Sequence, residues 1–236
     1  MIQPSIGILL IILLSFLLGS IPFALLINKL FFKTDLRKTG SKNMGALNTF
    51  RTASQEKNKW IGLVSFLSVF LLDAGKAILA IILSTIIAKA SLNNITLAIT
   101  LSSFFVVLGH NYSIFLKFKG GRGAASLLGI LFYLSEQAFF SWYIFGAWLI
   151  IVLCFMILFE IIAGGTIKNN LFKNAISNQI IGRLIGEVVA VLWIYTISVE
   201  VFYPASAATI LVLIAHKDRL AEQIKNIRNH TYLKTK

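Results

Sequence analysis

Small, amide-bearing and cationic residues are concentrated between residues 35 and 51, in the stretch DLRKTGSKNMGALNTFR. Glycine lets backbone N–H groups come close to an anion, and an arginine can bind a phosphate through two parallel hydrogen bonds. The stretch therefore predicts an anion-binding loop, whose candidate residues are Ser41, Asn43, Gly45, Asn48 and Arg51. The alternative is a solvated basic loop that only fixes the topology.

A second cluster, from Gly109 to Ser126, contains the run Lys-Gly-Gly-Arg-Gly at the expected start of a helix. The N-terminus of a helix offers unpaired N–H groups and the positive end of the helix dipole. This arrangement predicts a phosphate-binding loop, although the spacing is not that of a Walker A motif. Its candidate residues are Lys119, Gly120, Gly121, Arg122 and Gly123. The alternative is a tight turn between two helices.

A few titratable residues fall within apolar segments. Asp73 and Lys76 are three positions apart and so lie on one face of a helix, where they either support a site or neutralise each other structurally. His110 and His216 are each expected at one end of an apolar helix, where a histidine can contact a ligand or the helix dipole.

Arg183 and Glu187 stand one helical turn apart beside the close-packing pattern Gly182-xxx-Gly186, which predicts helix packing. No His/Glu spacing such as HExxH is present, and the single cysteine excludes an internal disulfide or a Cys-based metal site, so we expect no metal.

The elements that must position these residues are strongly apolar. Of the 236 residues 57% are hydrophobic and only 13% charged, whereas a soluble domain has about 25% charged residues. This composition excludes a soluble enzyme and a disordered chain. A membrane-spanning helix needs about 20 apolar residues, and seven segments approach that length: 5–32, 60–88, 95–116, 124–135, 139–163, 180–199 and 202–215. We predict an all-α, polytopic integral membrane bundle of about seven transmembrane helices, forming one domain over residues 1–236.

Two further local features bear on this bundle. Pro22 lies inside the first segment and should kink it, because proline lacks a backbone N–H. The stretch 164–178 is rich in Gly, Asn and Lys and is expected to be an inserted polar loop.

The basic residues are distributed unevenly about this bundle. Nineteen of the 22 Lys and Arg residues fall in 33–59, 117–123, 164–183 and 216–236, which alternate onto one side of the membrane. The positive-inside rule therefore predicts an outside N-terminus and a cytoplasmic C-terminus, and five crossings would leave the C-terminus inside as well. The net charge of +13 indicates orientation and contact with the lipid bilayer rather than nucleic acid binding.

The sequences GSIPF, DLRKTGSKNMGALNTFR, DAGK and GHNYSIFLKFKGGRGAAS together resemble the membrane acyl-phosphate:glycerol-3-phosphate acyltransferases of the PlsY type, over about residues 15–130. The last of them resembles the family pattern GHxxxxFxxFKGGKGxAT. The resemblance implies a seven-helix fold with its active site on the cytoplasmic side of the cell membrane. It also implies transfer of a fatty acyl group from acyl-phosphate to the primary hydroxyl of glycerol 3-phosphate, with no metal or other cofactor.

The resemblance carries over residue by residue. Ser41, Asn43, Asn48 and Arg51 match the first motif, Asp73 and Lys76 match an Asp-x-x-Lys pattern, and His216 matches the histidine of an RHxxN segment. Lys119, Gly120, Gly121 and Gly123 match the phosphate-binding loop. We expect Ser41, Arg51, Arg122 and His216 to act in catalysis, and the other candidates, His110 among them, to bind substrate. The positions that depart from the family pattern are Lys42, Leu47, Ala77, Arg122, Ala215 and Arg219.

Three other interpretations stay open. The basic loops could form the entry funnel of a transporter or channel for a phosphorylated solute, although the polar groups gather on one side. The chain could be a catalytically inactive relative that acts as a structural partner. Within enzymology, Ser41 could act as a nucleophile. No feature of the sequence indicates an oligomeric state.

Overall fold

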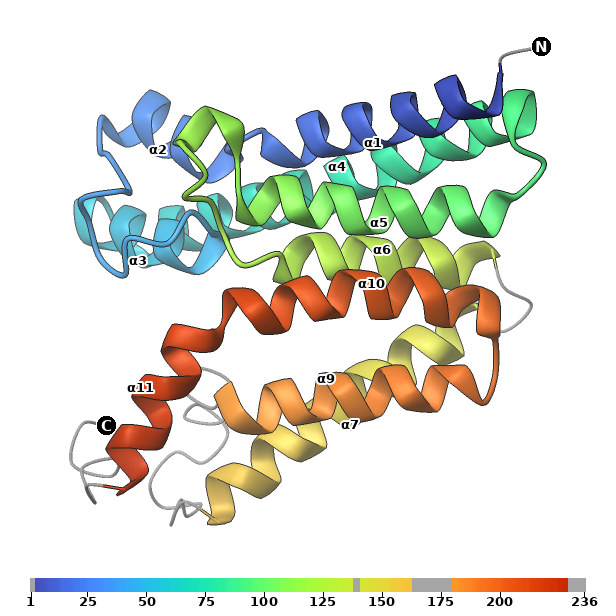
Figure 1. The fold of residues 1–236 in the computed structure, drawn as a ribbon. Helices are drawn as coiled ribbons and strands as arrows, with labels where there is room; N and C mark the ends of the chain where they lie inside the picture. The colour runs from blue at the N-terminus through green and yellow to red at the C-terminus, as the bar shows by residue number, and fades with distance from the viewer. Residues whose placement is uncertain (1–2, 138–140, 163–179, 229–236) are drawn as a thin grey trace. The chain divides into compact units, whose positions relative to one another are not determined.

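The computed structural model describes residues 3–137, 141–162 and 180–228, and its regular elements in these ranges are all helices (Figure 1). They are α1 (Pro4–Ser20), α2 (Phe23–Phe32), α3 (Ala46–Glu56), α4 (Lys59–Ser91), α5 (Ile95–Asn111), the 3-10 turn η1 (Ile114–Leu116), α6 (Ala124–Gln137), α7 (Ser141–Ile162), α9 (Ile180–Tyr195), α10 (Val199–Ala215) and α11 (Lys217–Arg228). The polar loop expected at 164–178 lies outside the described residues.

The chain forms two compact units. The first comprises Met1–Tyr133 and Tyr203–Val212, and the second comprises Leu134–Phe202 and Leu213–Lys236. The single domain expected over 1–236 stays a prediction.

Each of the seven apolar segments contains a helix, which confirms the all-α class. Four described spans are long and apolar enough to cross a bilayer: Pro4–Phe32, Lys59–Ser91, Ile95–Leu116 and Trp142–Ile162. A fifth is added if α10 and α11, which bend by 56° at their junction, count as one span. The helices in two further apolar segments, α6 and α9, have 14 and 16 residues and are shorter than a full crossing. The count of seven crossings and the orientation of the termini stay predictions.

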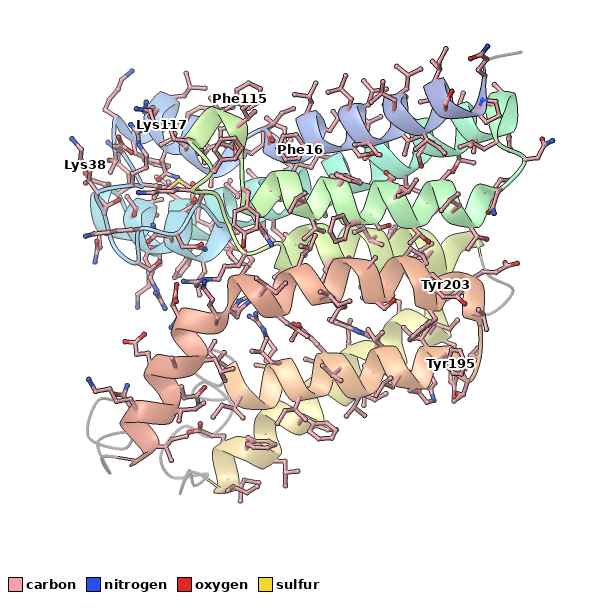
Figure 2. The ribbon with its side chains drawn as sticks, viewed as in Figure 1. Phe16, Lys38, Phe115, Lys117, Tyr195 and Tyr203 are labelled. Atoms are coloured by element: carbon pink, nitrogen blue, oxygen red, sulfur yellow. The ribbon has the colours of Figure 1, made fainter. Side chains whose placement is uncertain are left out.

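In the first unit, α1, α4 and α5 lie side by side (Figure 1). Phe16 marks α1 in Figure 2. Glycines allow this close approach: a Cβ on Gly19 would lie 2.1 Å from the Val106 carbonyl oxygen, and one on Gly109 would lie 2.2 Å from that of Phe16. The outer faces carry exposed leucines such as Leu13 on α1. Apolar side chains packed on one face and exposed on the other fit helices that border lipid.

The kink expected at Pro22 is a complete break between α1 and α2. Proline has no N–H to continue the helix, and it forces the residue before it out of the helical conformation. Ile21 accordingly has an extended backbone, with φ −60° and ψ 118°. After the break, α2 packs on α3, and Asn28 Nδ2 donates a hydrogen bond to Thr49 Oγ1 at 2.9 Å.

In the second unit, α7 and α9 pack through the glycine pair that the sequence indicates. A Cβ on Gly182 would lie 2.5 Å from the carbonyl oxygen of Phe155, and one on Gly186 would lie 2.8 Å from Val152 Cα. The polar helix α11 caps the N-terminus of α9, because Gln223 Oε1 accepts hydrogen bonds from the first two amides of α9 at 2.8 and 3.0 Å.

Candidate functional site

The loop between α2 and α3 is organised by Asn48, in the first turn of α3. Its buried Oδ1 accepts from the amide of Ser41 at 3.0 Å, and its Nδ2 donates to the carbonyls of Thr39 and Asn43 at 3.2 and 3.1 Å. Gly40 stands in the left-handed region with φ 55°, and a Cβ there would lie 2.3 Å from Asn48 Oδ1. Asn48 therefore shapes the loop, while Ser41 remains exposed.

The other candidates of this loop lie around that frame. Gly45 precedes α3, and Asn43 and Arg51 are half-buried. Lys42, at a position where the resembling family usually has glycine, keeps a left-handed backbone with φ 56°. At the outer side of the loop Arg37 pairs with Asp35 at 2.6 Å, and this hydrogen-bonded guanidinium holds the pKa of the Asp35 carboxyl below its usual range.

The second loop folds back onto the end of α5. The amide of Gly120 donates to the Asn111 carbonyl at 3.0 Å and that of Gly121 donates to the His110 carbonyl at 2.9 Å, so these two N–H groups face the protein. Gly123, with φ 78°, then leads into α6. An anion at this loop would meet the first amides of α6 and the cations rather than the amides of Gly120 and Gly121.

Beneath this loop lies a buried charged cluster that joins α1, α4 and α5. Lys76 Nζ lies 2.7 Å from Asp73 Oδ1, 3.0 Å from His110 Nδ1 and 3.0 Å from the Ile21 carbonyl oxygen. Asp73, Lys76 and His110 are 2%, 4% and 7% exposed, respectively. The start of α6 is tied to the same place, since Ser126 Oγ donates to the Asp73 carbonyl at 3.0 Å.

The two loops meet at Gly121, beside His110, which in turn contacts Lys76 of the third cluster. A Cβ there would lie 2.1 Å from His110 Nε2 and 2.9 Å from the carbonyl oxygen of Met44, which belongs to the first loop. Glycine is thus required where the two loops and the histidine approach one another. Lys119 is exposed and Arg122 half-buried beside this point. Figure 2 shows Lys38 of the first loop and Lys117 of the second at one end of the first unit, with Tyr203 at the other.

His216 lies in the second unit, whereas the other candidate residues lie in the first unit. It ends α10, and its Nε2 is hydrogen-bonded by Arg183 of α9. Arg183 Nε in turn pairs with Glu187 Oε1 at 3.2 Å. The sequence indicated only packing for Arg183 and Glu187, because spacing along one helix says nothing of a histidine 33 positions away.

Sequence reasoning also missed two backbone carbonyls, those of Ile21 and Met44, because backbone groups carry no residue-type signal. Pro22 was the available hint for Ile21, since a broken helix leaves carbonyls without helical partners. Among the residues that the structure describes, no group of three or more His, Cys, Asp or Glu side chains could hold a metal ion.

Comparisons with known proteins give one consistent result. A family model described as glycerol-3-phosphate acyltransferase matches residues 9–226. A glycerol-3-phosphate acyltransferase of Ehrlichia ruminantium (strain Gardel) is 32% identical over 227 residues, covering 95% of this chain and 96% of that protein. One of Moorella thermoacetica is 35% identical over 145 residues, and the match covers 61% of this chain and 66% of the relative. One of Anaplasma marginale (strain Florida) is 39% identical over 142 residues, covering 60% and 63%. The matches with these last two therefore span less than two thirds of the relatives' length.

The fold is also similar to that of solved membrane proteins. A crystal structure of PlsY, an integral membrane glycerol 3-phosphate acyltransferase, in its glycerol 3-phosphate form has a TM-score of 0.62 at 24% identity. The alignment covers 95% of this chain and 93% of that one. The lysophosphatidic acid form gives a TM-score of 0.59 at 23% identity, with the same coverage.

Proposed function

The chain belongs to the glycerol-3-phosphate acyltransferase family, and from that membership we propose that it transfers a fatty acyl group from acyl-phosphate to the primary hydroxyl of glycerol 3-phosphate. The products are lysophosphatidic acid and inorganic phosphate. We place the reaction at the cytoplasmic surface of the cell membrane, where a soluble dianion and a donor with an apolar tail can meet.

The observation that carries this proposal is the junction at Gly121, where the two glycine-rich loops and the buried cluster come together. Lys119, Arg122 and Arg51 give this end of the first unit positive charge. A site for two phosphate-bearing reactants needs such charge close to apolar walls, since the donor also carries a fatty chain.

The reaction balances without an enzyme-bound intermediate. The hydroxyl oxygen of glycerol 3-phosphate bonds to the carbonyl carbon of the donor, and the bond from that carbon to the bridging phosphate oxygen breaks. The hydroxyl proton passes to the acceptor's own phosphate, and inorganic phosphate leaves. His216 is a poorer proton acceptor for this step, because its Nε2 already accepts from Arg183.

Four of the candidate residues then have roles in positioning or charge stabilisation. Lys119, Arg122 and the first amides of α6 stabilise the charge on the departing phosphate, and Ser41 orients the attacking hydroxyl. Arg51 binds the acceptor's phosphate. Orientation of two bound reactants can lower a barrier by up to ~7–11 kcal/mol.

The test is a turnover assay on the purified protein. Palmitoyl-phosphate and radiolabelled glycerol 3-phosphate should yield labelled lysophosphatidic acid, whereas palmitoyl-CoA and palmitoyl-acyl carrier protein should not. Absence of product from all three donors, while a known family enzyme is active in the same detergent, would show an inactive relative. If palmitoyl-CoA were the only donor to yield product, acyl-phosphate would be refuted as the donor.

Mass spectrometry of protein incubated with donor alone adds a second outcome. An acyl adduct on Ser41 would replace direct transfer by a covalent mechanism. Uptake of glycerol 3-phosphate into proteoliposomes without turnover would support transport instead.

A further inference from the structure

The Lys76 ammonium has three N–H donors and three neighbouring acceptors. An ammonium cannot accept a hydrogen bond, so Lys76 donates to the Ile21 carbonyl and to His110 Nδ1, and it forms an ion pair with Asp73 Oδ1. All three side chains are almost completely buried. The Lys76 ammonium is therefore surrounded by groups of the protein, two that accept hydrogen bonds and one counter-ion.

This arrangement fixes which ring nitrogen of His110 carries the proton. Nδ1 lies 3.0 Å from the ammonium of Lys76 and 3.5 Å from Asp73 Oδ1. The shorter contact is with a group that only donates, so Nδ1 must accept. A neutral imidazole that accepts at Nδ1 carries its hydrogen on Nε2.

That Nε2–H lies against the glycine loop. It faces Gly121 so closely that a Cβ there would lie 2.1 Å away, whereas the contact with Lys76 is made by the other ring nitrogen, Nδ1. His110 as a whole is 7% exposed, and its Nε2 is not among the completely buried polar atoms that lack a partner, so this N–H is open to a ligand at the loop.

We propose that Asp73 and Lys76 are positioning residues that hold His110 as the Nε2–H tautomer, and that this N–H donates to the phosphate group bound at the 119–123 loop. The inference rests on the proposed function for the identity of the phosphate-bearing ligand. Asp73 and Lys76, which the sequence predicted to bind substrate, thereby have a different role, because they act through His110.

The first experiment observes the tautomer directly in the full-length protein. Nitrogen-15 NMR of histidine-labelled protein, with the His110 signals assigned by their loss in His110→Gln, should show a protonated Nε2 and an unprotonated Nδ1. A protonated Nδ1 in the wild type would overturn the proposal. Titration with inorganic phosphate should shift the Nε2 resonance, and no shift at saturating phosphate would equally overturn it.

The second experiment removes the positioning pair without leaving a lone buried charge. In Asp73→Leu/Lys76→Met the tautomer preference should be lost, and the KM for a phosphate-bearing substrate should rise about 10-fold or more. Removing both charges together avoids an unpaired buried ion. The matched control is Lys89→Met, the same substitution at an exposed position of the same helix, which should leave kinetics and tautomer unchanged.

The third experiment concerns the histidine itself. His110→Phe should lower kcat/KM about 10- to 100-fold, the effect expected for losing a hydrogen bond to a charged group. His110→Gln, which keeps an N–H near the position of Nε2, should recover most of this loss. Equal kcat/KM for His110→Phe and the wild type would contradict the inference.

The two proposals fail separately. The phosphate-induced shift at Nε2 does not require turnover, so a shift in a protein that makes no lysophosphatidic acid would refute only the proposed function. Turnover without any shift would refute only the role of His110.

Discussion

Asn48 uses both atoms of its side-chain amide inside the loop between α2 and α3. It is 1% exposed and bridges the backbone of Thr39, Ser41 and Asn43. The amide acts on any substrate only through the shape it gives this loop. The same holds for Gly120 and Gly121, whose N–H groups point into the protein.

We therefore expect Asn48→Asp to be as damaging as Asn48→Ala. The aspartate keeps an acceptor for the Ser41 amide but places a carboxylate oxygen opposite two carbonyls, whereas the asparagine donates to both. Each variant should lower the free energy of unfolding by about 1–3 kcal/mol. Thermal unfolding in detergent measures this effect.

Asn43→Ala is the matched control for Asn48, because Asn43 contributes its carbonyl, not its side chain, to the network. It should be close to the wild type in unfolding temperature. Wild-type stability of Asn48→Asp would show that the amide is not the frame of the loop.

At the residue scale, the sequence predicted which segments form the candidate site but not which of their atoms face inward. Residue types pointed to Ser41, Gly121 and Lys76, and the structure brings their segments together. Which atom faces inward depends on tertiary contacts with Ile21, Met44 and His110, and no local spacing encodes those contacts.

The helices divide into those that hydropathy reveals and those that it does not. Each apolar segment contains a helix, because a long apolar run in this composition has few other stable structures in a membrane. The polar helices α3 and α11 lie in the basic segments 33–59 and 216–236, where hydropathy predicts no helix because there is no apolar run. Side-chain hydrogen bonds join them to neighbouring helices, Asn28 to Thr49 for α3 and Gln223 to the Ile180 amide for α11.

The pairing of α7 with α9 gives a prediction at this scale. Gly186→Ala should destabilise the protein by about 1–3 kcal/mol, because the new methyl would meet the backbone of Val152 and the helices would have to separate. Gly146→Ala on α7 is the matched control, since nothing lies within 4 Å of its added Cβ.

Replacing glycine by alanine favours the helical state by up to about 1 kcal/mol, and this gain applies to both variants. The difference between them therefore reports the helix contact. Gly146→Ala should keep or raise the unfolding temperature, and Gly186→Ala should lower it. Equal temperatures for the two variants would mean that the helices do not depend on this contact.

Over the whole molecule the governing property is the uneven distribution of charge. In the first unit Lys38 and Lys117 lie at one end, while the connection between α4 and α5 lies at the other (Figures 1 and 2). The positive-inside rule assigns the lysine end to the cytoplasm.

Cysteine labelling in sealed cells tests this orientation. Cys154 is the only cysteine of the chain, so Cys154→Ser gives a clean background. In that background, a membrane-impermeant maleimide added outside should label Asn93→Cys and leave Lys38→Cys unlabelled until the cells are opened. Labelling of Lys38→Cys from outside would reverse the orientation and with it the proposed cytoplasmic site.

The helix break at Pro22 and the buried Lys76 depend on each other. Because α1 ends there, the Ile21 carbonyl accepts from the Phe23 amide at 3.2 Å and from Lys76 Nζ, 55 positions away in the chain. In a related chain with α1 and α2 joined into one continuous helix, the Ile21 carbonyl would accept a hydrogen bond from the helix backbone. The buried lysine would then lose an acceptor and destabilise the fold. The proline and the lysine should therefore be retained together or lost together as such chains diverge.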